Sequence, residues 1–288
     1  ALLGAATVAR AATPPPIQVP WTTYLPAGPG PTSPQPHAVP YCRYGRVSCV
    51  QTELRRLTRL RDRLGCDHRA VFATTYLELT RELYREVRRH PHLFAHPRYL
   101  YYEDALFADV YFNTFRAAEQ GKRVAPAWRI AFATARGDGA NAAQDMLLGI
   151  NAHVQNDMPF VLAALGQRTP RGASRKADHD VMNDVLGRAY IPVVEAIRRR
   201  YDAVLDITNP SWSPVDDIAG LELVREWREV VWRNAEALLR ARTAAERRAV
   251  TASIQANAAN WARVIAAPSV PDYRATRDPY CARQVLGR

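Results

Sequence analysis

The stretch DHRAVFATTYLELTRELYREVRRH, from Asp67 to His90, has the pattern of a long amphipathic helix. Its apolar residues recur every three or four positions, which places one set of them on a single side of a helix: Phe72, Tyr76, Leu79 and Leu83. A half-buried strand would need apolar and polar residues to alternate, and this stretch does not keep that alternation. The sequence therefore predicts a helix with one buried face.

The same helical spacing extends along most of the chain, and strand-like alternation persists nowhere. Further helices are predicted over residues 50–65, 98–121, 126–137, 149–165, 178–206, 215–242 and 243–268. No internal repeat is evident. We therefore expect an all-α protein, an irregular bundle of many helices.

The N-terminal region has a different composition. Prolines dominate from Thr13 to Pro40, and such a segment forms neither a helix nor a ladder of strands. Before it, the segment Ala9-Arg10-Ala11 has the small-x-small pattern at which leader peptides are cleaved. We expect a leader remnant and an extended arm over residues 1–48, followed by a single helical domain over residues 49–288.

The four cysteines favour an exported protein. They are widely spaced, even in number, and contain no C-x-x-C pair of the kind used by zinc ribbons. Together with the leader-like start, they predict disulfides and a secreted, extracellular location. The preferred pairing joins Cys42 to Cys49 and Cys66 to Cys281, although the sequence leaves the two other pairings open.

The chain is strongly basic, with 39 Lys and Arg against 28 Asp and Glu and a formal charge of +11. The arginines are spread over the predicted helices instead of being interleaved with aromatic residues in one block, so no specific nucleic-acid partner is predicted. No apolar run reaches the ~18 residues that a transmembrane helix needs. A solvated, arginine-rich surface is the simplest interpretation.

The most unusual polar signal lies in GINAHVQNDMPFVLAAL, from Gly149 to Leu165. His153 and Asp157 are four residues apart, so they share a helix face with apolar neighbours. A buried carboxylate is costly unless it is hydrogen-bonded, paired or bound to a metal. Pro159 cannot donate to the carbonyl of Gln155, so we expect the helix to loosen where these polar residues gather.

A metal site is one hypothesis for this pair. His153 and Asp157 offer a nitrogen and an oxygen to one point, which suits a divalent cation such as zinc. Asp104 and Asp180 are the predicted additional ligands, and a second set is predicted to orient the substrate or water: Asn151, Asn183 and Tyr76. The alternative is a His–Asp hydrogen bond inside a polar core network.

Other catalytic patterns are missing from the sequence. The chain contains no G-x-S-x-G elbow, no H-E-x-x-H helix and no phosphate-binding P-loop. His68 stands beside the start of a predicted helix and is expected to be a surface residue. The sequence thus offers no second motif that competes with the His153 cluster.

Four ordered motifs carry a family resemblance: DHRAVFATTYLELT, VAPAWRIAF, LLGINAHVQNDMPFVL and DHDVMNDVL. They resemble an uncharacterised domain-of-unknown-function family of secreted proteins from actinomycete-type bacteria, over about Cys49 to Asp206. The most specific motif is N-x-H-x-x-x-D-x-P. The resemblance implies no established activity, but it implies these motif positions: Asp104, Asn151, His153, Asp157, Asp180 and Asn183.

The H-x-x-x-D pair is also similar to one in secreted, all-α zinc phospholipases C and related single-strand nucleases. That similarity implies metal-assisted attack on a phosphodiester. The chain departs from those enzymes because it has few histidines and no evident terminal-amine ligand. We therefore carry two hypotheses: a metal-dependent hydrolase of a phosphoester or lipid-like substrate, and a non-catalytic, disulfide-stapled binding or structural protein with a polar core.

Overall fold

The computed structural model describes residues 32–137, 139–203, 217–267 and 273–287. Within these residues the structure is helical, and its only β-type pairing is an isolated bridge between Arg168 and Ser174. The predicted all-α class is therefore confirmed. The predicted leader remnant and most of the proline-rich arm lie outside the described residues, so the proposed division of the chain at residue 48 stays a prediction.

Ten α-helices, two π-helical segments and one short 3-10 turn make up the described elements. In chain order they are η1 (Pro40–Cys42), α2 (Ser48–Leu64), α3 (Arg69–Arg89), α4 (Pro97–Glu119), α5 (Pro126–Arg136), α6 (Ala142–Asn151), η2 (Ala152–Asp157), α7 (Met158–Leu165), α8 (Lys176–Arg200), α9 (Asp217–Arg240), α10 (Ala244–Ile265), α11 (Tyr273–Cys281) and η3 (Ala282–Leu286). No described helix is long and apolar enough to cross a membrane.

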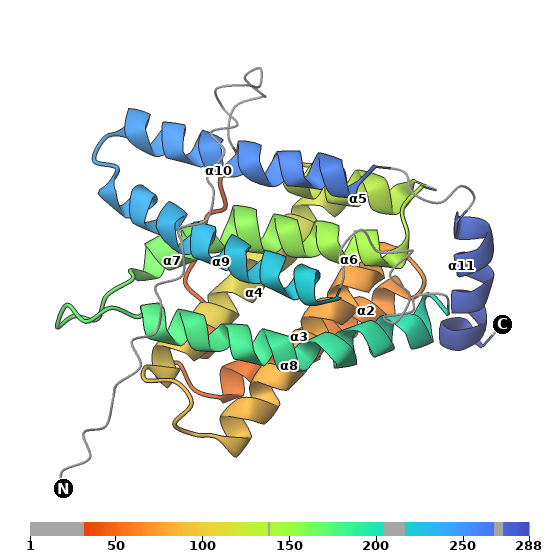
Figure 1. Ribbon diagram of the computed structural model, residues 1–288, viewed down its shortest axis with the longest axis horizontal. Coiled ribbons are helices and arrows are strands. Elements are labelled where there is room, and N and C mark those ends of the chain that lie inside the picture. The colour runs from red at the N-terminus through yellow and green to blue at the C-terminus, as the bar shows by residue number, and fades with distance from the viewer. Residues whose placement is uncertain (1–31, 138, 204–216, 268–272, 288) are drawn as a thin grey trace, which may run out of the picture.

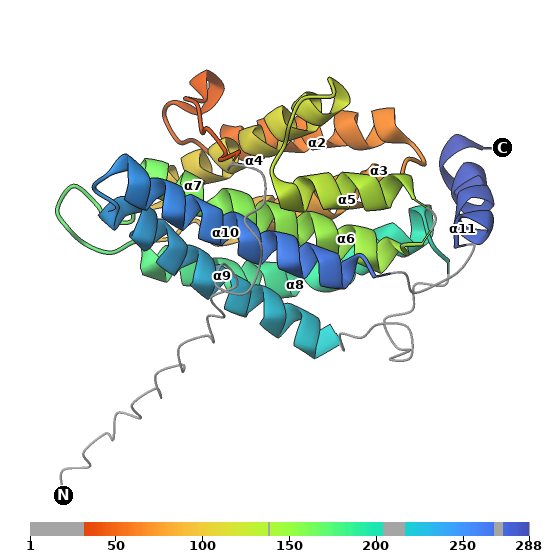
Figure 2. The ribbon, with the colours of Figure 1, turned by 90° about the horizontal axis from the view of Figure 1, so that it is seen from above.

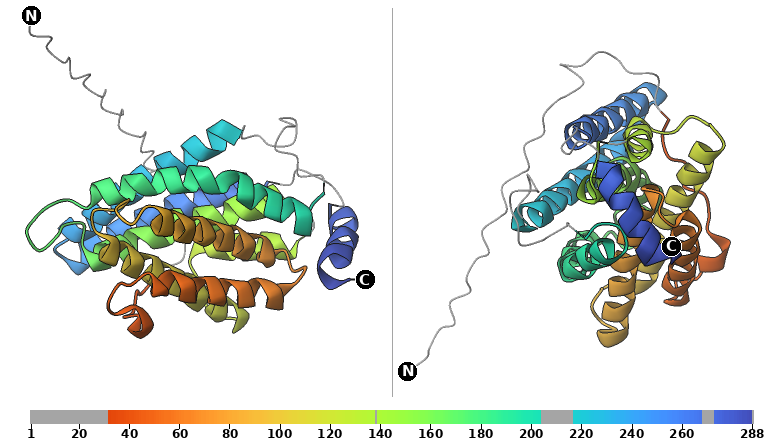
Figure 3. Two further views of the ribbon diagram at one scale, coloured as in Figure 1. Left: turned by 90° about the horizontal axis from the view of Figure 1, so that it is seen from below. Right: turned by 90° about the vertical axis from the view of Figure 1, so that its right-hand side faces the viewer.

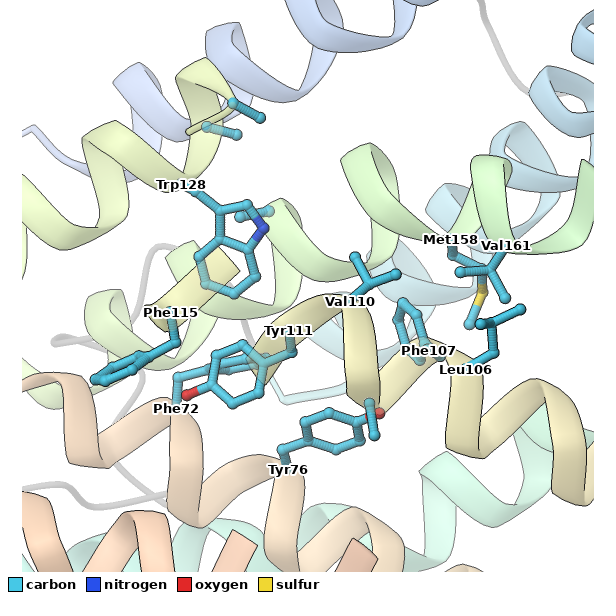
Figure 4. Packing of buried hydrophobic residues seen from close by; sticks show 14 of the residues in the cluster. Phe72, Tyr76, Leu106, Phe107, Val110, Tyr111, Phe115, Trp128, Met158 and Val161 are labelled. Carbon is cyan, nitrogen blue, oxygen red and sulfur yellow. The ribbon is translucent and has the colours of Figure 1, made fainter. Parts of the chain in front are cut away.

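Helix α3 is the central element of the bundle. It packs against α2, α6 and α8, and the elongated helices lie roughly along one common direction (Figures 1 and 2). Helices α9 and α10 correspond to the last two predicted helices and form an antiparallel pair, with a capping box of Thr243 and Glu246 at the start of α10. The main core consists largely of the aromatic and aliphatic side chains between α3, α4 and α5 (Figure 4).

The polar stretch after Gly149 differs from the predicted single helix. The helix begins earlier, at Ala142, and residues Ala152–Asp157 form a π-helical segment in which Met158 donates its N–H to the carbonyl of His153. Pro159 follows directly, at the start of α7. The loosening expected from Pro159 is thus confirmed, and a widened turn of this kind often marks a functional site.

The C-terminal helix α11 was not predicted. It stands at one end of the bundle, across the ends of the long helices (Figures 1 and 3). A disulfide from Cys281 to Cys66 fixes it there, and Cys42 is joined to Cys49. The preferred cysteine pairing is therefore confirmed.

Candidate ligand cavity

The helices around α3 line a partly open cavity of about 190 Å³. For comparison, an engineered apolar cavity of about 150 Å³ is large enough to bind benzene. Most of the wall is apolar and comes from α3, α4, α6, η2, α8 and α9; the larger contributors include Leu79, Met146, Ile150, Leu186, Val193 and Val224. The buried face predicted for residues 67–90 supplies Phe72, Tyr76, Leu79 and Leu83 to this wall.

The cavity is elongated along α3. Its lining on this helix extends from Phe72 to Leu83, which corresponds to about 16 Å at 1.5 Å per residue. On α8, the lining residues of the same cavity extend from Met182 to Val194. A modest volume spread over this length leaves a narrow space, which suits a single chain better than a broad, rigid ring system.

The two ends of the cavity differ in chemistry. Helices α3 and α8 are antiparallel, since Thr74 bonds Tyr201 near one end and Glu86 pairs with Arg188 near the other. At the first end, which we call the apolar end, the wall consists of Ala143, Met146, Val193 and Val194. At the second, the polar end, it includes Glu103, Asp104 and Arg228 beside Leu83, Leu100 and Met182.

Two polar groups on the wall have no hydrogen-bond partner in the part of the chain that the structure describes. The hydroxyl of Tyr76 and Oδ2 of Asp104 are buried without a hydrogen bond among the described residues. Burial raises the pKa of Asp104 well above its ordinary range, and the nearby carboxyls of Glu53 and Glu103 raise it further. A protonated Asp104 is a hydrogen-bond donor, as is Tyr76, so both can bind an acceptor on a ligand.

His153 presents a third unpartnered atom. Its Nδ1 donates to Oδ2 of Asp157 at 3.0 Å, whereas its Nε2 is buried and has no partner among the described residues. Burial lowers the pKa of His153, although its bond to Asp157 opposes this. The ring is therefore neutral at physiological pH, with its proton on Nδ1 and a lone pair on Nε2.

The orientation of the His153 ring is fixed from two sides. It lies flat on the ring of Phe107, with a centroid separation of 3.5 Å and an interplanar angle of 4°. Tyr76 lies close to it, at a centroid separation of 5.0 Å. Figure 4 shows that Tyr76 comes from α3 and Phe107 from α4. Side chains from three elements thus hold an unpartnered acceptor beside an unpartnered donor.

Asp157 is the group that orients His153. Its Oδ2 also accepts from Nε1 of Trp128 at 2.9 Å, and its Oδ1 accepts from Nδ2 of Asn156 at 2.6 Å. These three N–H donors satisfy the buried carboxylate, which is therefore part of a hydrogen-bonded polar network in the core. The contact that sequence analysis predicted between His153 and Asp157 is present, but the carboxylate is already occupied.

Arg228 on α9 lines the polar end, and the sequence did not predict this. Its side chain is buried, and its hydrogen bonds reach Oδ1 of Asn183 at 2.7 Å and the carbonyl of His179 at 2.5 Å. The third contact of the guanidinium is Sδ of Met158, at 3.6 Å. Charged residues usually lie at the surface, but the spacing of Arg228 from Val224 and Trp232 places it on the apolar face of α9.

The predicted metal ligands do not assemble into one site. Asp180 is half-exposed and pairs with Lys176, and three N–H groups occupy Asp157. Within residues 32–137, 139–203, 217–267 and 273–287, no group of three or more His, Cys, Asp or Glu side chains is arranged to hold a metal ion. Asp157 and Asp180 are thus already paired within the protein, and a zinc ion at these residues stays a prediction.

The predicted orienting residues are divided among different tasks. Asn151 donates to the carbonyl of Ala258 and accepts from Gln155, so it ties the end of α6 to α10 and does not line the cavity. Asn183 positions Arg228, and Tyr76 lies on the cavity wall. Of the predicted site residues, Tyr76, Asp104 and His153 come together on this wall.

His68 is not the surface residue that was predicted. Its side chain is 1% exposed, and its two ring nitrogens contact Asp145 at 2.9 Å and Asp278 at 3.3 Å. No local pattern indicated this burial, because Asp278 lies 210 residues away on the unpredicted helix α11. His68 lies away from the elongated cavity and helps to hold α11.

If Asp157 serves only as a hydrogen-bond acceptor in the polar core, Asp157→Asn should lower the free energy of unfolding by about 1–3 kcal/mol, since at least one buried N–H loses its acceptor. The loss should be the same with and without chelator. Asp180→Asn, at the exposed position, should change stability by less than about 0.5 kcal/mol. Thermal melting checks both variants; a chelator that destabilises the wild type but leaves Asp157→Asn unchanged would support a metal instead.

Burial of Glu103 predicts a pH effect on stability. Its pKa is raised from 4.5 to about 7, mainly by burial, with Arg228 opposing the shift. Between these two values the folded protein keeps a proton that the unfolded chain has lost, so stability falls as the pH rises, by at most about 3 kcal/mol. Glu103→Gln should flatten the dependence of the free energy of unfolding on pH over this window, whereas the exposed control Glu195→Gln should not. Chemical denaturation at a series of pH values measures the slopes. Equal slopes in the two variants would contradict this assignment.

The fold and the cavity define a class of protein, an all-α bundle with two disulfides and an elongated, partly open cavity that is polar at one end. Residues 50–268 match the model of a Family of unknown function (DUF5995), and the chain belongs to this family. The match confirms an uncharacterised family and extends past the stretch that carried the resemblance. No curated protein and no solved structure matches the chain.

Proposed function

We propose that the protein binds a lipid-like molecule, with one narrow apolar chain and a polar head, in the cavity along α3. The observation that carries this proposal is a set of three atoms on the mostly apolar wall that have no hydrogen-bond partner among the described residues: the Tyr76 hydroxyl, Asp104 Oδ2 and His153 Nε2. Each buried polar group without a partner costs about 1–3 kcal/mol. A bound head group, with its waters, supplies those partners, and the apolar chain fills the rest.

The two disulfides support a role outside the cytoplasm, where such bonds persist. An apolar molecule needs a protein carrier in such an aqueous compartment, because its transfer into an apolar cavity removes its surface from water. The proposed role is therefore the sequestration or transport of a lipid-like molecule in an oxidising compartment.

The test uses the length of the cavity. Ala143 lies at the apolar end, so Ala143→Phe should shorten the space and weaken the binding of dodecanol by roughly tenfold or more, while octanol still binds. Ala252→Phe, on the exposed face of α10, is the matched control and should bind both alcohols as the wild type does. Displacement of an environment-sensitive fluorescent probe measures the affinities. Failure of the wild type to bind either alcohol, or equal loss for both alcohols in both variants, would refute the proposal.

Hydrolysis of an ester of such a molecule is the second candidate function. The specific observation in its favour is the neutral ring of His153, which Asp157 orients and whose Nε2 is unpartnered at the cavity wall, as a general base requires. Turnover of a dodecanoyl ester by the wild type, lost in His153→Gln with binding retained, would support it. A wild type that binds the ester without turning it over would remove this candidate and leave the binding role.

A further inference from the structure

Arg228 is a buried cation whose contact partners are all neutral. Arg228 is 3% exposed, and the nitrogens of its guanidinium contact an amide oxygen, a backbone carbonyl and a thioether sulfur. None of the ion pairs among the described residues includes Arg228. Burying a charge is costly unless an opposite charge pairs with it, so this position calls for an anion.

The polar end restricts what kind of anion fits. Glu103 and Asp104 line the same end, so a doubly charged phosphate would face two carboxyl groups and only one arginine. A carboxylate carries a single charge, and its two oxygens match the planar fork of a guanidinium. In protonated form, Asp104, which lines the same end, can donate to that carboxylate.

We propose that Arg228 binds the carboxylate of a single-chain carboxylic acid whose alkyl chain extends along α3 toward Val193. This inference rests on the proposed binding function and names its ligand class. The chain leaves the head group past Leu79, Ile150 and Leu186, and its far end lies beside Met146 and Val194. The direction follows from the position of Arg228 at one end of the cavity and of apolar side chains at the other.

The carboxylate of Glu103 competes with the ligand carboxylate for Arg228. Variants of both residues can therefore test the proposal. Burial lowers the pKa of Arg228, and the carboxylate of Glu103 on the same cavity wall raises it. The two side chains nevertheless form no contact ion pair among the described residues. Removing the charge of Arg228 removes the anchor for the carboxylate. Removing the charge of Glu103 frees the anchor, so the two variants should change acid binding in opposite directions.

The experiment compares dodecanoic acid, dodecanol and methyl dodecanoate by probe displacement at one slightly alkaline pH, at which the free acid is ionised. The wild type should bind the acid roughly ten- to a hundredfold more tightly than either neutral molecule. Arg228→Gln should abolish that preference, and Arg228→Lys should reduce it. Arg225→Gln, one turn earlier on α9 and paired with Glu222 at the surface, should retain it.

Glu103→Gln keeps the proposal testable if the Arg228 variants do not fold. It should tighten binding of the acid severalfold and leave binding of the alcohol and the ester unchanged. Equal affinities for acid and alcohol in the wild type, unchanged by Glu103→Gln, would overturn the assignment of Arg228 while leaving the binding function intact. If the wild type bound none of the three molecules, this result would instead contradict the binding function itself.

Discussion

Replacing Cys66 and Cys281 together with serine is expected to lower the free energy of unfolding by about 4–5 kcal/mol. This disulfide joins residues separated by 215 positions, so its loss frees a very long loop in the unfolded chain. The bond also holds α11, where the buried Arg277 donates to the carbonyl of Cys66. Denaturant unfolding of the oxidised proteins measures the difference.

The second disulfide provides the control for this prediction. Cys42 and Cys49 are only 7 positions apart, so the corresponding double serine variant should lose about 2 kcal/mol on the same loop-closure argument. Equal losses in the two double variants would show that loop length does not determine the contribution of these bonds.

Gly149→Ala is expected to destabilise the protein by about 3 kcal/mol, a large effect for one methyl group. A Cβ at this position would lie 2.2 Å from Cγ of Phe72. The Phe72 ring cannot easily move away, because it packs edge-on against Tyr111 and Trp128 at centroid separations of 5.2 and 5.6 Å. Overpacking a tightly filled site of this kind usually costs about 1–3 kcal/mol, and occasionally more.

Gly187 on α8 gives a matched helical control. A Cβ there would lie 3.6 Å from Cδ2 of Leu221, an ordinary contact, so Gly187→Ala should stabilise the protein by about 0.5–1 kcal/mol. Thermal melting of the two variants gives the comparison. If both substitutions changed the melting temperature in the same direction, the close contact of Gly149 with Phe72 would not be the controlling feature.

Local patterns predicted the helices because each depends on neighbouring residues. The spacing of Phe72, Tyr76 and Leu79 predicted the central helix and its buried face, and Pro159 predicted the loosened turn before α7. Helix α11 escaped prediction because Tyr273–Cys281 contains few apolar residues and an internal proline, and its position depends on a disulfide and on Arg277.

The candidate site was only partly predictable. His153 and Asp157 were recognised because their contact lies within one turn, and Tyr76 and Asp104 because their neighbours are apolar. The cavity itself depends on the volume left between helices that are distant in the sequence, which no local pattern records. Arg228 could have been found from its spacing with Val224 and Trp232, but its partners Asn183 and His179 come from another helix.

The central claim is that the space between α3 and α8 holds a single apolar chain. A crystal structure of the protein with saturating dodecanoic acid tests it most directly. We predict continuous electron density for one alkyl chain along the wall from Leu83 to Phe72, with its head beside Arg228. A cavity that contains only ordered water, or that side chains fill while the acid binds elsewhere, would contradict the account.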